Sequence, residues 1–200
     1  MQQAIAYLTE KDSVFQHIID TFGLPVIPRR PQGFQTLVLL ILEQQVSIDS
    51  AKACFIKLQA IVPSLAPEAL RALPDEAFRS CGISRQKTAY IKGLSEAVIN
   101  GGIVLESLAE KPAGQVREEL IRLKGIGNWT IDIYLMFCLE APDIIPIGDI
   151  AVVNTMKELW GFDNKEAMVS HADNWAPHRS LATYLLWHYY LQKRGRKVVY

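Results

Sequence analysis

A glycine turn and an aspartate that follows it are the residues whose types and spacing could do chemistry. The turn lies in Leu123-Lys124-Gly125-Ile126-Gly127-Asn128-Trp129-Thr130, with apolar-periodic sequence on both sides. Two glycines two positions apart permit a tight turn with positive φ at little steric cost. Backbone N–H groups at the start of the next helix, helped by the helix dipole, form a seat for a phosphate. The segment is therefore a candidate clamp on a nucleic-acid backbone, and an ordinary helix–helix turn is the alternative.

Asp149 lies 22 residues beyond Gly127, in Pro146-Ile147-Gly148-Asp149-Ile150. A carboxylate held in place can stabilise a developing positive charge and can orient or deprotonate a water molecule. An aspartate after a glycine at a helix start is also an ordinary N-cap. The two roles are compatible, because a cap would hold the carboxylate rigidly.

Helices must position these residues, because apolar side chains recur at helical spacing and no strand-like alternation is sustained. The turn joins a helix that ends near Leu123 to an almost continuously apolar helix from Trp129 to Leu139, which indicates central burial. Asp149 begins a helix that runs to Trp160. Further helices are expected over 9–23, 34–58 with a break at 44–49, 67–72, 76–81, 84–100, 163–175 and 177–194, and the tail 198–200 is expected to be loose. The predicted fold class is all-α.

Composition limits the class of protein. The chain has 200 residues, half of them apolar, which fits one domain or one domain with two lobes. Its 21 basic and 21 acidic residues give a formal net charge of +0, which argues against a polybasic binder and predicts modest non-specific DNA affinity. Cys54, Cys81 and Cys138 suggest neither a disulfide framework nor a metal knuckle. The chain carries neither a signal-peptide pattern nor a long uncharged apolar run, so no membrane contact and a cytoplasmic, nucleoid-associated location are expected.

Four motifs, in order over about residues 30–190, resemble the helix-hairpin-helix DNA glycosylase superfamily. They are Glu43-Gln44-Gln45-Val46-Ser47, Gly82-Ile83-Ser84-Arg85-Gln86-Lys87-Thr88-Ala89-Tyr90-Ile91, the glycine turn with Asp149, and Trp175-Ala176-Pro177-His178-Arg179-Ser180-Leu181-Ala182 with Leu186-Trp187. A tryptophan at the position of Trp129 resembles the branch of 3-methyladenine DNA glycosylase II, whose members remove alkylated bases. The resemblance implies one all-α, two-lobed domain over residues 1–200, with a central cleft and a helix-hairpin-helix at about 115–139. This domain is expected to lack the N-terminal β domain of the inducible bacterial enzyme.

The resemblance implies that Asp149 is the catalytic carboxylate, because cleaving a base from deoxyribose passes through an oxocarbenium-like sugar. It also implies that the damaged base leaves the stack and is read in an aromatic pocket. Cationic alkylated purines are attracted to electron-rich rings by about 0.5–2 kcal/mol. The implied pocket residues are Trp129, Trp187 and Tyr134, for which core packing is the alternative. Ile133 and Ile150 stand where the inducible enzyme has tyrosines, which leaves the substrate range open.

The partner that the resemblance implies is double-stranded DNA. Gln45 matches a side chain that fills the gap left by the extruded nucleotide, and plain surface is the alternative. Arg179 could contact a phosphate or form a structural ion pair. The other implied DNA contacts are Gly125, Gly127, Asn128 and Thr130, and the backbone carbonyls implied to face a Na⁺ or K⁺ ion are those of Ile121, Leu123 and Ile126. No further cofactor is expected, because the chain lacks the four-cysteine iron–sulfur motif of the endonuclease III branch.

The residue at the hairpin indicates the type of reaction. Family members that also cut the strand carry a lysine two residues after the second glycine, for Schiff-base attack on C1′. Here that residue is Trp129, and Lys124 precedes the glycines. The prediction is a monomeric, monofunctional hydrolase that removes alkylated purines such as 3-methyladenine and 7-methylguanine. A glycosylase for an oxidised or deaminated base is the alternative among enzymes, and a non-catalytic DNA-binding hairpin is the alternative of another class.

Overall fold

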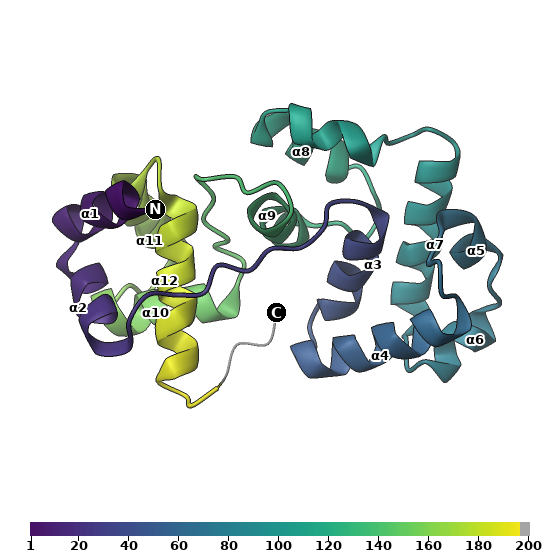
Figure 1. The fold of residues 1–200 in the computed structure, drawn as a ribbon, viewed down its shortest axis with the longest axis horizontal. Helices are drawn as coiled ribbons and strands as arrows, with labels where there is room; N and C mark the ends of the chain where they lie inside the picture. The colour runs from purple at the N-terminus through teal and green to yellow at the C-terminus, as the bar shows by residue number, and fades with distance from the viewer. Residues whose placement is uncertain (197–200) are drawn as a thin grey trace. The chain divides into compact units, whose positions relative to one another are not determined.

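The computed structural model describes residues 1–196 of the chain (Figure 1). These residues form helices and loops and contain no strand, so the predicted all-α class is confirmed. The chain divides into two compact units. Met1–Arg29 and the chain from Leu135 onward form unit 1, and Arg30–Tyr134 form unit 2. The expected loose tail, 198–200, lies outside the described residues.

Unit 2 is built on α3 and α7. It contains α3 (Phe34–Glu43), α4 (Ile48–Ile61), α5 (Pro67–Ala72), α6 (Asp75–Ser80), α7 (Arg85–Ile99), the 3-10 helix η1 (Leu105–Glu110), α8 (Ala113–Leu120) and the first part of α9 (Asn128–Phe137). α7 packs against α5 and α3, and α3 packs against α4. α3 is buried along most of its length, as its run of valine, leucine and isoleucine requires.

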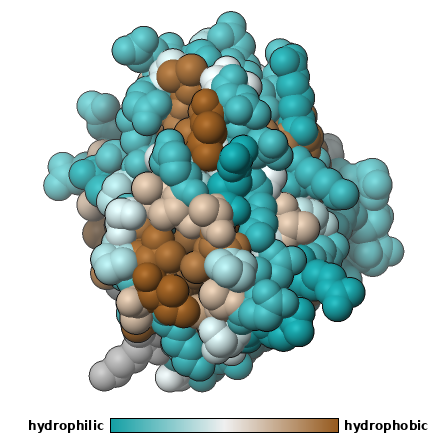
Figure 2. Space-filling model, turned by 90° about the vertical axis from the view of Figure 1, so that its right-hand side faces the viewer, coloured by the Kyte–Doolittle hydropathy of each residue, from teal (hydrophilic) through white to brown (hydrophobic). Residues whose placement is uncertain are grey.

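α4 stays exposed along most of its length. Only Ala51 and Leu58 are fully buried, while the apolar Ile48, Ile56 and Ile61 remain exposed. Figure 2 shows apolar patches among hydrophilic side chains on one face of the molecule. The long apolar run of 34–58 therefore contains one core helix and one surface helix, separated by the break predicted at 44–49.

Unit 1 surrounds α12. It contains α1 (Gln2–Lys11), α2 (Ser13–Phe22), the end of α9, α10 (Ile150–Trp160), α11 (Lys165–Ala172), the 3-10 helix η2 (Asp173–Trp175) and α12 (Arg179–Gln192). Every residue from Ala182 to Tyr189 is buried, and α12 packs against α10, α2 and α1 (Figure 1). A helix that is apolar on all sides belongs at the centre of a helical unit.

Three predicted helix boundaries are wrong. The single helix expected over 9–23 is α1 followed by α2, because Asp12 adopts an extended backbone and its carboxylate accepts the Val14 N–H. The last helix begins at Arg179, where the Asp143 carboxylate accepts the backbone N–H, and not at Pro177. The helix expected over 163–175 is α11 followed by the tighter η2.

Candidate functional site

The glycine segment forms a turn between two helices of unit 2. α8 ends at Leu120 and α9 begins at Asn128. In the turn, the Leu123 N–H donates to the Leu120 carbonyl at 3.1 Å, and the Ile126 N–H donates to the Leu123 carbonyl at 3.0 Å. The turn is therefore ordered by its own backbone, and the first backbone N–H groups of α9 follow directly after Gly127.

The two glycines of the turn meet different constraints. Gly125 has a φ of +91°, and a Cβ there would lie 2.2 Å from the Tyr90 ring. A Cβ at Gly127 would meet no protein atom within 4 Å, and the φ of Gly127 lies outside the left-handed range. Gly125 is thus required by the fold, whereas nothing inside the chain explains the missing side chain at Gly127.

Gln44 ties the hairpin to the end of α3. Its Nε2 donates to the Gly125 carbonyl at 2.8 Å and to Thr130 Oγ1 at 3.0 Å. Thr130 is only 1 % exposed, and a buried hydroxyl cannot contact DNA. The Thr130 hydroxyl helps to hold the hairpin, and the predicted DNA contact of Thr130 stays a prediction for its backbone N–H group in the first turn of α9. Sequence reasoning assigned a role to Gln45 alone and did not identify this contact of Gln44, because Gly125 lies 81 positions away.

Gln45 is the exposed member of the glutamine pair. Its φ is +58°, a left-handed conformation that non-glycine residues adopt rarely and at a cost of about 1–2 kcal/mol. Its neighbours are fixed from several sides: Lys87 Nζ donates to the Leu42 carbonyl at 2.7 Å, Arg30 forms a two-bond ion pair with Glu43, and Ser47 accepts the Ser50 N–H as N-cap of α4. Leu65 and Glu140 also have a positive φ, and Gln45 differs from them by lying exposed between the anchored ends of two helices.

An ion pair joins the two helices of the hairpin. Arg117 of α8 donates to Asp132 of α9 at 2.5 Å and to Asn128 Oδ1 at 3.1 Å. Burial raises the pKa of Asp132, and the hydrogen bond from Arg117 opposes that shift. Asn128 is exposed beside the turn, where a DNA contact is predicted, and its side chain is oriented by Arg117.

Asp149 is the N-cap of α10 in unit 1. Its Oδ1 accepts the N–H groups of Ala151 at 2.9 Å and Val152 at 3.1 Å, and the indole N–H of Trp187 at 3.0 Å. The predicted cap is confirmed, and a third donor from α12 orients the same carboxylate. Asp149 is half-buried, so it is not walled off from solvent. A carboxylate held by three fixed donors is suited to stabilising a positive charge that develops beside it.

Trp187 belongs to an aromatic cluster in unit 1. Its ring lies 5.7 Å from the Phe137 ring and 5.8 Å from the Tyr184 ring, and Phe137 stacks on Tyr184. Trp187 is 8 % exposed, so it offers little surface on which a base could stack. Its indole N–H positions Asp149, a contact that sequence reasoning did not identify because the two residues are 38 positions apart.

The other two predicted pocket aromatics differ in exposure. Trp129 lies in the first turn of α9 and is half-buried, which leaves part of its ring accessible. Tyr134 is fully buried, and its hydroxyl accepts the Gly33 N–H at 2.9 Å. A side chain without exposed surface cannot stack on a base, so the structure corrects the expected pocket role of Tyr134 to a role in the core of unit 2.

Arg179 forms a structural ion-pair cluster. Its guanidinium donates to both carboxylate oxygens of Asp143 at 2.8 Å and to Asp173 at 3.1 Å. This hydrogen bonding holds the pKa of Asp143 below its ordinary value and raises that of Arg179. The cluster fixes the start of α12 to the loop after α9, which favours the structural alternative over the predicted phosphate contact.

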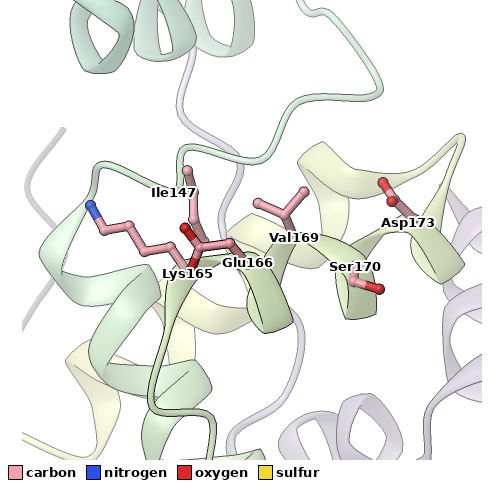
Figure 3. Close-up of a pocket in the computed structure, with 6 residues that line it drawn as sticks. All are labelled: Ile147, Lys165, Glu166, Val169, Ser170 and Asp173. Carbon is pink, nitrogen blue, oxygen red and sulfur yellow. The ribbon is translucent and has the colours of Figure 1, made fainter.

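A shallow groove of about 480 Å³ lies beside the loop that leads to Asp149. Figure 3 shows Ile147 of this loop facing side chains of α11 and η2. Its lining residues are Ile147, Lys165, Glu166, Val169, Ser170 and Asp173. The lining contains charges of both signs and no aromatic ring, so this groove is not the predicted aromatic pocket.

The residues predicted to hold a monovalent cation lie in the hairpin turn. Within residues 1–196, no group of three or more His, Cys, Asp or Glu side chains is placed to hold a metal ion. A cation at the turn would therefore depend on backbone oxygens, which are suitable ligands for Na⁺ or K⁺. The Leu123 carbonyl already accepts the Ile126 N–H and has a second lone pair, and Ile121 is exposed.

Across the described part of the chain, no helix has both the length and the apolar content that a membrane span needs.

Comparison with protein families gives one match that covers most of the chain. The model of the HhH-GPD superfamily base excision DNA repair protein matches residues 38–178. This range contains Gln45, the glycine turn and Asp149, and it ends within the Trp-Ala-Pro-His motif that precedes α12.

Known proteins with similar sequences or structures include 3-methyladenine DNA glycosylases. The chain is 29 % identical over 165 residues to DNA-3-methyladenine glycosylase 1 of Schizosaccharomyces pombe, covering 79 % of this chain and 72 % of that protein. The solved 3-methyladenine DNA glycosylase (Mag1) of S. pombe in complex with abasic DNA matches with a TM-score of 0.85 and 27 % identity, over 92 % of this chain and 95 % of that one. The DNA-3-methyladenine glycosidase of Bacillus halodurans matches with a TM-score of 0.83 and 32 % identity, over 96 % and 91 %.

Proposed function

Because the chain belongs to the HhH-GPD superfamily of base excision DNA repair proteins, we propose that it is a DNA glycosylase that hydrolyses the N-glycosidic bond of alkylated purines in duplex DNA. The similarity to two 3-methyladenine glycosylases, each matched over nine-tenths of this chain or more, supports that substrate class. The observation that carries the proposal is the carboxylate of Asp149, oriented by three N–H donors at the start of α10.

Asp149 stabilises the sugar as the base departs. Loss of the base leaves positive charge on C1′ and the ring oxygen, and a nearby carboxylate lowers the energy of that state. A water molecule then adds to C1′, and the carboxylate orients it or takes its proton. Alkylation has already weakened the glycosidic bond, so the enzyme needs no strong acid to protonate the leaving base.

Trp129 is the proposed ring on which the extruded base stacks. A 3-methyladenine or 7-methylguanine base is cationic, and an indole face attracts a cation by about 0.5–2 kcal/mol. The half-exposed ring of Trp129 supports this role better than the buried ring of Trp187 does. Trp187 acts on the reaction by orienting Asp149.

The hairpin is the proposed grip on the DNA backbone. The open position at Gly127 allows a phosphate to approach the first N–H groups of α9, where a side chain would stand in the way. Exposed Asn128 is available to add a side-chain contact. A Na⁺ or K⁺ ion on the carbonyls of Ile121, Leu123 and Ile126 would add a positive charge at the same place. Gln45 fills the space left by the extruded nucleotide.

The proposal is tested by release of methylated bases from alkylated duplex DNA. We expect Asp149→Asn to lower the single-turnover rate by about 100-fold or more, because asparagine keeps the helix cap but loses the negative charge. The matched control is Asp12→Asn. Asp12 also caps a helix and also accepts a tryptophan indole N–H, from Trp160. Similar rates for wild type and Asp149→Asn would remove Asp149 from catalysis.

We further propose that the enzyme leaves an intact strand. Schiff-base chemistry needs an amine that attacks C1′, and the position two residues after Gly127 is occupied by Trp129. We expect abasic-site product that becomes nicked only after alkali treatment, and no protein–DNA cross-link on borohydride addition. A borohydride-trapped adduct would contradict the hydrolytic mechanism.

A further inference from the structure

We propose that Gln44 is a positioning residue. Its contact with the hairpin fixes the distance between the phosphate-binding turn and the Gln45 side chain that is inserted into the DNA. The inference rests on the proposed function, because it assigns these two features to DNA. Gln44 itself is half-buried and belongs to neither contact surface. Its role follows from which groups its amide joins.

The amide of Gln44 spans the turn. One nitrogen donates to the Gly125 carbonyl at 2.8 Å and to Thr130 Oγ1 at 3.0 Å, so it holds the glycine turn and the first part of α9 together. The Gly125 carbonyl can only accept, so it requires an N–H donor, which a glutamine provides and a glutamate does not. Thr130 is buried, so the contact is shielded from water and retains its strength.

The backbone of Gln44 leads directly into the exposed tip. Gln44 is the C-cap of α3, and the next residue, Gln45, has the left-handed φ of +58°. Such a conformation persists only where the surrounding structure determines it. Lys87 fixes the last turn of α3, Ser47 fixes the start of α4, and Gln44 links the segment between these two helices to the hairpin.

This link has a specific consequence for base extrusion. A phosphate seated at the hairpin and a side chain inserted into the stack must be a fixed distance apart on one duplex. All the groups involved belong to unit 2, so their spacing is set within one compact body. Without the amide, the hairpin can still bind a phosphate and Gln45 can still be exposed, but the distance between them is no longer fixed.

A double-mutant cycle tests the coupling. We expect Gln44→Leu to slow single-turnover release of methylated bases about tenfold, as the loss of two hydrogen bonds predicts, with little change in affinity for undamaged duplex. In a Gln45→Ala background, Gln44→Leu should add less than about twofold, because the residue through which it acts is gone. Additive losses would overturn the proposal, since they would mean that Gln44 only stabilises the hairpin.

Controls separate the coupling from general loss of structure. Gln35→Leu removes an equivalent side-chain bond, to the Ser64 carbonyl, from the other end of the same helix and should leave the rates unchanged. Thr130→Val removes one of the two acceptors and should give part of the Gln44→Leu effect. Gln44→Glu keeps the shape of the side chain and loses its N–H donors, so it should show the same loss. It replaces Gln44→Leu as the test variant if thermal denaturation shows that Gln44→Leu is unfolded.

A second readout does not require catalysis. A duplex with a tetrahydrofuran abasic site and 2-aminopurine opposite to it reports insertion into the gap by a fluorescence change. We expect Gln44→Leu to bind this duplex but to lose most of the fluorescence change. Wild-type protein that gives the change without releasing methylated bases would contradict the proposed function and leave the coupling standing; an unchanged signal in Gln44→Leu would overturn the coupling.

Discussion

Gly125 and Gly127 lie two positions apart, yet the absence of a side chain has a different cause at each. At Gly125 the backbone is left-handed and the Tyr90 ring occupies the space where a Cβ would stand. At Gly127 the space is open. Gly127 therefore leaves room for a DNA phosphate to approach the adjacent N–H groups of α9, which is the role proposed for it.

Alanine at each glycine should therefore give opposite results. We expect Gly125→Ala to lower the free energy of unfolding by roughly 2–5 kcal/mol, because it combines an unfavourable φ with a clash against a ring. Gly127→Ala should cost no more than about 1 kcal/mol but should weaken binding of abasic-site duplex about tenfold. Chemical denaturation and fluorescence anisotropy measure the two quantities.

Gly114→Ala is the control for Gly127→Ala, because Gly114 is also in open space without a positive φ, in α8. It should change neither quantity beyond about 0.5 kcal/mol. Unchanged DNA affinity in Gly127→Ala would rule out the backbone clamp at this position.

The sequence shows which residue types form the candidate site, but it does not show which contacts each of these residues makes. Asp149 at a helix start and Gln45 at a helix junction follow from local patterns. The indole of Trp187 meets Asp149 across 38 residues, and Gln44 meets Gly125 across 81. Such contacts depend on how helices pack, and nothing in the periodicity of one segment specifies them. For the same reason, the apolar pattern predicted central burial of the helix from Trp129 to Leu139 but did not show that Trp129 would keep exposed surface and Tyr134 would not.

At the level of elements, a buried charge joins the two hairpin helices. Asp132 lies in an almost wholly apolar helix and is 6 % exposed, a position where a carboxylate needs a partner. The sequence shows that need, and the structure supplies Arg117 of α8. Burial raises the pKa of Asp132 despite that partner. The folded chain thus binds the Asp132 proton more tightly than the unfolded chain does, so this contribution to stability falls as pH rises through the raised pKa.

Removing the partner should make the hairpin sensitive to pH. In Arg117→Met, no hydrogen bond from Arg117 offsets the effect of burial, so the pKa of Asp132 rises further. We expect a loss of about 2 kcal/mol in unfolding free energy at pH 7, because the buried carboxylate has lost its partner. The loss relative to wild type should shrink as pH falls and Asp132 takes up its proton. Urea denaturation of both proteins at pH 7 and pH 5 measures the difference.

Lys111→Met is the control, because it breaks a more exposed ion pair, with Glu119 of α8. It should cost less than about 1 kcal/mol. An Arg117→Met loss that is the same at both pH values would show that Arg117 stabilises the hairpin by packing and not through the charge of Asp132.

At the level of the whole molecule, charge is balanced and much of it is used internally. The formal net charge is +0. Arg30, Arg117 and Arg179 each pair with a carboxylate. The proposed DNA grip relies instead on backbone N–H groups of the hairpin, beside exposed Arg122 and Lys124. A protein that neutralises few phosphates releases few counterions when it binds.

DNA binding should therefore depend weakly on salt. With roughly two or three phosphates neutralised, the slope of log affinity against log salt concentration is expected to be about −2 to −3. Affinity for undamaged duplex should then fall roughly 10- to 100-fold between about 50 and 200 mM salt, as measured by anisotropy. Lys124→Ala should reduce the slope by about 1 if this side chain contacts a phosphate. A slope of about −7 or steeper would mean that a wide basic surface binds the duplex, and the hairpin would then be a minor part of the grip.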